Sequence, residues 1–181
     1  LEIHEDLGNK GGMGTNLNNI GIVHNNKGDY DKALDYYGRS LAIKEDIGDK
    51  RGMAASLKSI GNVHHDKGDY KKAEKHLEKS LSIQKEIGLK AIELLTTTYL
   101  YLTYKHLGKD YDVKEIYILI KDKRHRGYTL NLRLYELLED KSYLKTAYNQ
   151  IQKQTDNLEP DVATKFLSYP IPKAIVEEWE K

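Results

Sequence analysis

The chain has 181 residues, of which 39% are hydrophobic and 31% charged, and its 29 basic and 28 acidic residues leave a formal net charge of +1. This balance excludes the broad positive potential that draws basic domains to nucleic acid or anionic membranes, and the absence of cysteine excludes disulfides and thiolate chemistry. Because no apolar run could span a membrane and residues 1–20 lack the pattern of a signal peptide, we expect a soluble, cytoplasmic protein.

The sequence repeats itself with a period of 40 residues. Half of residues 1–40 are identical to the residue 40 positions further on, without a gap. A fixed period in this range is typical of stacked supersecondary units, since one such unit cannot bury its apolar face alone. The repeat therefore predicts an array that offers an extended surface to a partner.

Each full period predicts two helices, because apolar residues recur every three or four positions. A glycine follows each helix, as suits a left-handed C-cap, and we interpret 48–52 as the turn between repeats. Residues 1–7 align with the second helix and so belong to a truncated preceding repeat. The expected helices of the two regular repeats are 13–27, 31–47, 53–67 and 71–87.

The pattern diverges beyond residue 90, as terminal repeats of an array do when they cap it. We expect helices at 91–107, 113–122, 128–138, 143–158, 160–167 and 172–179. Ile171, Ile175 and Trp179 share one face of the last helix, which predicts a cap over the last repeat. Alternatively, this helix or the open N-terminal end joins two copies as a homodimer.

The repeated motif resembles the tetratricopeptide repeat family, and the 40-residue period is similar to its long-repeat, kinesin light chain-like branch. The resemblance implies an all-α, right-handed superhelical array of helix-turn-helix repeats with a C-terminal capping helix. The expected boundaries are 1–12 for a truncated repeat, 13–50, 51–89, 90–126 and 127–158 for four repeats, and 159–181 for the cap. The motif consists of Leu17, Ile20, Gly21, His24, Gly28, Asp29, Tyr30, Ala33 and Tyr37, and it recurs as Leu57, Ile60, Gly61, His64, Gly68, Asp69, Tyr70, Ala73 and Leu77.

The resemblance also implies a non-catalytic scaffold that holds a peptide or helix of a partner protein in a concave groove. Asparagine carries both a donor and an acceptor, which suits the backbone of an extended peptide, and Lys58, His65 and Lys105 would favour acidic groups. The alternatives are that these are merely solvated helix residues, or that the array regulates a longer signalling enzyme or self-associates. The candidate groove residues are Thr15, Asn18, Asn19, Ile22, Asn25, Asn26, Lys58, Asn62, His65, Thr98, Leu102, Lys105, Asn131 and Tyr135.

Other kinds of site find little support in the sequence. The order of lysines and asparagines does not match the two-carboxylate clamp of some tetratricopeptide domains. Neighbouring His64 and His65 point about 100° apart on a helix, so we expect no metal. Residues 8–14 lack the phosphate-loop order, and the basic segment 121–126 is typical of a solvated helix end. No nucleophile and base stand together, so we expect neither catalysis nor a cofactor.

Overall fold

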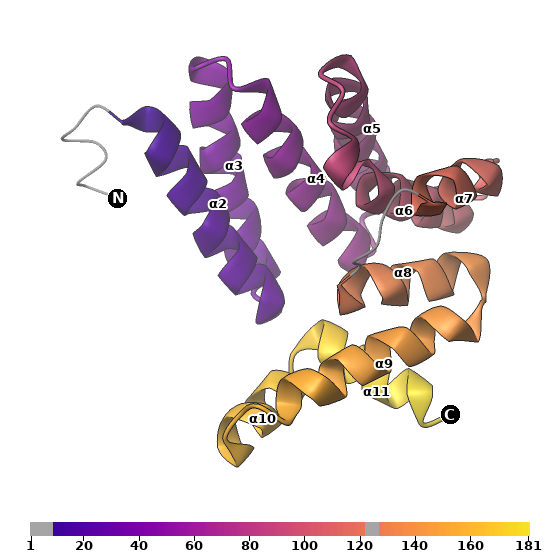
Figure 1. The fold of residues 1–181 in the computed structure, drawn as a ribbon. Helices are drawn as coiled ribbons and strands as arrows, with labels where there is room; N and C mark the ends of the chain where they lie inside the picture. The colour runs from indigo at the N-terminus through magenta and orange to yellow at the C-terminus, as the bar shows by residue number, and fades with distance from the viewer. Residues whose placement is uncertain (1–8, 122–126) are drawn as a thin grey trace. The chain divides into compact units, whose positions relative to one another are not determined.

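The computed structural model describes residues 9–121 and 127–181 (Figure 1). Within these residues the secondary structure comprises ten helices and no strand, so the predicted all-α class is confirmed. The helices form two compact units. The N-terminal unit contains residues 9–25 and 29–111, and the C-terminal unit contains 26–28, 112–121 and 127–181. The helix predicted at 1–7 and the basic residues 123–126 lie outside the described residues.

The N-terminal unit is a run of helices joined by short turns (Figure 1). Successive helices pack against each other from α3 to α6, which confirms the predicted array of helical hairpins. Their first residues follow one another every 20 positions, so two helices make one 40-residue period. The helices are α2 (Lys10–Asn26), α3 (Tyr30–Asp46), α4 (Lys50–Asp66), α5 (Tyr70–Glu86) and α6 (Lys90–Leu107).

The turn between α3 and α4 is shorter than the sequence pattern suggested. Gly48 has a φ of 67°, and the N–H of Asp49 donates to the Lys44 carbonyl at 2.9 Å, which closes α3 with a left-handed cap. The Asp49 side chain then accepts a hydrogen bond from the Gly52 N–H at 2.9 Å and caps α4. Because of this cap, α4 begins at Lys50, and Gly52 lies in its first turn rather than in the connection.

The two helices of each regular hairpin approach each other at a glycine. A Cβ atom added to Gly61 would lie 2.6 Å from Leu77 Cγ, and one added to Gly21 would lie 2.6 Å from Tyr37 Cε1. Both distances are far inside van der Waals contact. Any side chain at these two positions would force the paired helices apart, as the repeated motif suggested.

Neighbouring hairpins are joined by an apolar cluster between α3 and α4. Ala33 and Tyr37 of α3 pack against Ile60 and Val63 of α4, and all four are buried. Burial of a side chain of this size stabilises the fold by about 1.5–3 kcal/mol. Burial also raises the pKa of the Tyr37 phenol to about 12. Apolar packing therefore supplies much of the cohesion between repeats.

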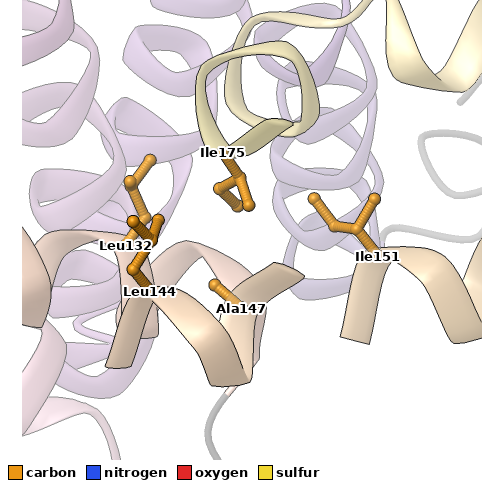
Figure 2. Packing of buried hydrophobic residues seen from close by; sticks show 5 residues of the cluster. All are labelled: Leu132, Leu144, Ala147, Ile151 and Ile175. Atoms are coloured by element: carbon orange, nitrogen blue, oxygen red, sulfur yellow. The ribbon is translucent and has the colours of Figure 1, made fainter. Parts of the chain in front are cut away.

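The C-terminal unit is built on a hairpin of two helices covered by a third. Figure 2 shows Ile175 of the last helix pointing toward Ala147, in a cluster that also contains Leu132, Leu144 and Ile151. The last helix therefore covers the hairpin, as the predicted cap would. The helices of this unit are α7 (Val113–Lys121), α8 (Tyr128–Leu138), α9 (Lys141–Thr155), α10 (Pro160–Leu167) and α11 (Pro170–Trp179).

Candidate functional site

Most of the predicted groove residues of the N-terminal unit remain accessible. Those on α2 lie on successive turns, as do those on α4, because residues three or four apart share one face of a helix. Five of the candidates are exposed: Thr15, Asn19, Ile22, Asn26 and Lys105. Five are partly exposed: Asn18, Asn25, Lys58, Asn62 and Tyr135.

The other four candidates are buried, with 0–7% of each residue exposed: His65, Thr98, Leu102 and Asn131. Their polar atoms have partners inside the protein. Thr98 donates its hydroxyl to the Leu94 carbonyl at 2.7 Å, and Asn131 Nδ2 donates to Gln150 Oε1 at 3.0 Å. Such side chains offer little to a ligand, so the surface that we propose below leaves these four out.

Tyr135 belongs to the C-terminal unit and already has a partner there. Its hydroxyl donates to Glu178 Oε1 at 2.9 Å, a bond that joins α8 to α11. This hydrogen bond raises the pKa of the Tyr135 phenol and contributes to lowering the pKa of the Glu178 carboxyl. The Tyr135 hydroxyl thus helps hold the cap, so Tyr135 is also left out of the proposed surface.

Lys58 of α4 carries a charge that the fold does not neutralise. Burial lowers the pKa of its ammonium, and no carboxylate of the described residues acts in the opposite direction. Because the folded chain disfavours the charged form, Lys58 costs stability at any pH below its lowered pKa, and the cost fades as the pH approaches the ordinary value of 10.5. An acidic group from a ligand would remove this cost.

Three asparagines near Lys58 or on α2 have an amide oxygen that accepts no hydrogen bond. The Oδ1 atoms of Asn18, Asn25 and Asn62 are buried and have no partner, although each side chain is partly exposed. A covered acceptor without a donor costs about 1–3 kcal/mol. Buried polar atoms are nearly always paired in native proteins, so these three oxygens mark positions on α2 and α4 where hydrogen bonding within the described residues is incomplete.

A cavity of about 220 Å³ lies where α2, α3 and α4 meet. We call it the junction cavity. Asn18, one of the candidate groove residues, forms part of its wall. Its lining consists of Thr15, Asn18, Ser40, Lys44, Asp49, Arg51, Gly52, Ala55 and Ser56.

The buried Lys44 side chain forms one side of the junction cavity. Its Nζ donates to the Gly11 carbonyl at 3.0 Å and to Thr15 Oγ1 at 3.1 Å, and it lies 3.1 Å from Asp49 Oδ2. Only 8% of the Lys44 side chain is exposed. The ammonium group therefore has three oxygen partners, and its position is fixed by contacts with both neighbouring helices.

Two glycines give the Lys44 stem its space. A Cβ atom at Gly14 would lie 3.0 Å from Lys44 Cε, and one at Gly52 would lie 2.7 Å from Lys44 Cδ. The Gly52 N–H is also the largest cause that holds the pKa of the Asp49 carboxyl below its usual value, with Lys44 a smaller contributor. Asp49 thus stays ionised beside the lysine, and the pair is neutral as a whole.

The sequence analysis missed this cavity because it treated 48–52 as a turn. A signal was nevertheless present. Residue 44 is lysine and residue 49 is aspartate, whereas the residues 40 positions later are Gln84 and Leu89. Because both charged residues are replaced by uncharged ones in the next repeat, the sequence indicates that their side chains contact each other. Gly52 leaves space for the stem of the lysine.

The described residues show no metal-binding group. His64 stacks on His76 with ring centroids 5.7 Å apart, and its Nδ1 lies 3.4 Å from Asp69 Oδ2. No set of three or more histidine or acidic side chains in 9–121 or 127–181 is placed to hold an ion. Across the same residues, no helix is both long and apolar enough to cross a membrane.

The paired helices, the glycine contacts and the 40-residue period define a helical repeat protein. Residues 12–86 match the tetratricopeptide repeat family, and this part of the chain belongs to that family. Comparison with curated proteins finds no matching sequence. Tetratricopeptide repeats are in general protein–protein interaction modules and typically have no catalytic role, which supports a role in protein binding for this part of the chain.

Proposed function

We propose that the N-terminal unit binds an extended, acidic peptide segment of a partner protein along α2 and α4. The surface consists of Thr15, Asn18, Asn19, Ile22, Asn25, Lys58 and Asn62, and we call it the groove surface. Asn26 is left out because it belongs to the C-terminal unit. The single observation that carries the proposal is the desolvated ammonium of Lys58, which has no acidic partner among the described residues, beside the partly exposed amide side chain of Asn62.

Lys58 and Asn62 favour a polar, acidic ligand. Lys58 offers donors and a positive charge, and the partly exposed amide group of Asn62 lies one helical turn further along α4. An extended peptide presents backbone N–H groups and, at an acidic residue, a carboxylate. Such a peptide supplies the acidic partner that Lys58 lacks, whereas an apolar helix laid on the surface would not.

The proposal predicts opposite effects of one substitution on binding and on stability. Lys58→Met keeps the length of the side chain and removes the charge. We expect the free energy of unfolding to stay level or rise, because a desolvated charge without an acidic partner is lost. We expect the affinity for an acidic peptide to fall about tenfold or more, since hydrogen bonds to charged groups contribute about 1.5–3 kcal/mol.

The measurement uses a peptide selected from a random display library against the whole chain. Its affinity is measured by fluorescence polarisation, and stability by thermal unfolding. Lys32→Met is the matched control, since Lys32 is exposed on α3 and the substitution changes the charge equally. A second variant, Asn18→Ala with Asn62→Ala, should weaken binding with little change in melting temperature. If the selected peptides lack acidic residues, or if Lys58→Met binds them as wild type does, the proposal is wrong.

A further inference from the structure

One face of α2, the first described helix of the N-terminal unit (Figure 1), is left exposed. It consists of Asn16, Ile20 and Val23, which share one side of the helix because residues three or four apart do so. We call it the open face. We infer that the open face is a docking surface for an amphipathic helix of a partner protein. The inference goes beyond the proposed function, since none of the three residues belongs to the groove surface.

The same face is buried in the second repeat. Its residues there, 40 positions later on α4, are Ser56, Ile60 and Val63, with exposed fractions of 1%, 6% and 0%. In the first repeat Val23 is 51% exposed, and the other two residues are partly exposed. Single exposed aliphatic residues are common on protein surfaces. Here, however, an identical valine at the equivalent position is fully buried, which indicates that the face is suited to packing.

The two helices do not differ in this way on the side that faces their own repeat. Leu17 and Leu57 are each 1% exposed, and Gly21 and Gly61 are both buried. The two glycines lie against the second helix of their own repeat, a neighbour that both repeats possess. The difference in burial is therefore confined to the face that α3 covers on α4 and that remains exposed on α2.

The helix that covers this face in the second repeat indicates the chemistry of the partner. Ala33 and Tyr37 of α3 pack against the two aliphatic residues of α4, and Ser40 Oγ lies 3.2 Å from Ser56 Oγ. The complementary helix thus has a small residue, a bulky apolar residue four positions later and a hydroxyl three positions after that. The same spacing recurs on α5 in Ala73, Leu77 and Ser80.

The open face carries no charge, so it favours a different ligand from the groove surface. Ile20 and Val23 favour apolar contact, and a small residue on the partner lets the two helices approach closely enough to cover them. The amide of Asn16 offers a donor and an acceptor to the hydroxyl. A second copy of the chain is a poorer occupant, because Ala33 and Ala73 of its α3 and α5 are already fully buried.

The test is a titration of the whole chain, labelled with ¹³C in its valine and isoleucine methyl groups. The probe is a peptide with the sequence of residues 29–47, in which a hydrocarbon staple replaces Gly38 and Ala42 and keeps the peptide helical. Both positions are exposed on α3, so the staple avoids the packing face. We expect a saturable shift of the Val23 and Ile20 methyl signals. The signals of Val63 should not move, because α3 already covers that residue.

A control probe and two variants of the chain define the contact. The probe with Tyr37→Glu should bind about tenfold more weakly or worse, and so should the variant Val23→Ser with the original probe, because each loses a buried apolar side chain. The matched control is Val162→Ser, since Val162 of α10 is 47% exposed and the change is the same. It should bind the probe as wild type does.

Three results would overturn the inference. The first is the absence of a saturable shift at Val23 with the probe at millimolar concentrations. The second is a Val23→Ser variant that binds the probe as tightly as wild type does. The third is a free chain whose open face is already occupied. Signals of Val23 that shift with the concentration of the chain alone would identify a second copy as the occupant, and contacts with residues 1–8 would identify the chain itself.

The outcome is independent of the fate of the proposed function. If the helical probe binds through Val23 while no selected peptide depends on Lys58, the docking surface stands and the proposed peptide surface is wrong. If a selected acidic peptide responds to Lys58→Met while the helical probe leaves Val23 unchanged, the groove surface stands and the docking surface is wrong.

Discussion

The two junctions between successive repeats of the N-terminal unit share a backbone plan and differ in chemistry. In the first junction, Ser40 donates its hydroxyl to the Gly14 carbonyl at 2.7 Å. In the second, Ser80 donates to the Ala54 carbonyl at the same distance. Each serine is fully buried, so this hydrogen bond between the two helices of a hairpin belongs to the repeat itself.

One helical turn later the junctions diverge. The first buries Lys44 against Asp49, whereas the second buries Gln84, whose Nε2 donates to Ser80 at 2.7 Å and to Thr96 at 2.9 Å. Both solutions fill the same space with a long polar side chain. The comparison shows that stacking of the repeats requires a hydrogen-bonded polar side chain at this position but no charge. The ion pair is therefore specific to the first junction.

The largest effect should come from breaking the ion pair on one side. Asp49→Leu places the residue of the second junction in the first and leaves the Lys44 ammonium buried without its carboxylate. Removal of one partner of a buried pair costs about 3–5 kcal/mol, and loss of the cap of α4 costs about 1 kcal/mol more. Chemical denaturation of Asp49→Leu should therefore show a loss of about 3 kcal/mol or more, given that Asp49 is one third exposed.

The double variant tests whether the two junctions are interchangeable. Lys44→Gln combined with Asp49→Leu should recover most of the stability lost by Asp49→Leu alone, because no unpaired charge remains. If the double variant is as unstable as the single one, the two junctions are not alternative solutions of one packing problem. Lys44→Gln alone should cost less, since Asp49 keeps the Gly52 N–H.

A smaller loss of stability should follow when a side chain is introduced at the glycine where the two helices of each repeat approach each other. Gly21→Leu and Gly61→Leu should each lower the free energy of unfolding by about 1–3 kcal/mol through overpacking. Gly38→Ala is the control, because nothing lies within 4 Å of an added Cβ there. It should raise stability by up to about 1 kcal/mol, as glycine is a poor helix former. A thermal shift near zero for Gly61→Leu would mean that α4 and α5 are not closely packed.

The sequence predicted the features that depend on local conformation and on the period. Glycine after each helix predicted the left-handed caps, and the 40-residue shift paired Gly21 with Gly61 correctly. The caps depend on the conformation of a few neighbouring residues, and the pairing of the glycines depends on a period that is constant along the two repeats. The expected start of α4 was late by three residues, because the capping role of Asp49 was not recognised.

The candidate site was predicted less well, because the burial of each side chain depends on neighbouring residues that the repeat pattern alone does not identify. Thr98 occupies the position of Asn18 shifted by 80 residues, yet it is fully buried and bonded to its own helix. Lys44 was not singled out, since a lysine late in a helix is ordinarily solvated. Its burial follows from Gly14 and Gly52, which lie on two other helices.

The smallest effect concerns a ring pair that differs between the repeats. His24 stacks on Tyr36 in the first repeat, and His64 stacks on His76 in the second. Burial is the main cause that lowers the pKa values of both His64 and His76. Lys67 and Lys72 add to the effect at His64, Asp69 opposes it, and Lys75, Lys79 and the charge of His64 add to it at His76.

Both folded-state pKa values lie below the unfolded value of 6.5, so the unfolded chain binds more protons below that pH. Stability contributed by the pair is present above pH 6.5 and is lost as the pH falls through the lowered values. His76→Tyr copies the first repeat and should reduce this loss. The measurement is the difference in melting temperature between wild type and variant from pH 8 to pH 5. A difference that stays constant over that range would show that the stacked histidines do not sense pH, and the two ring pairs would then be equivalent.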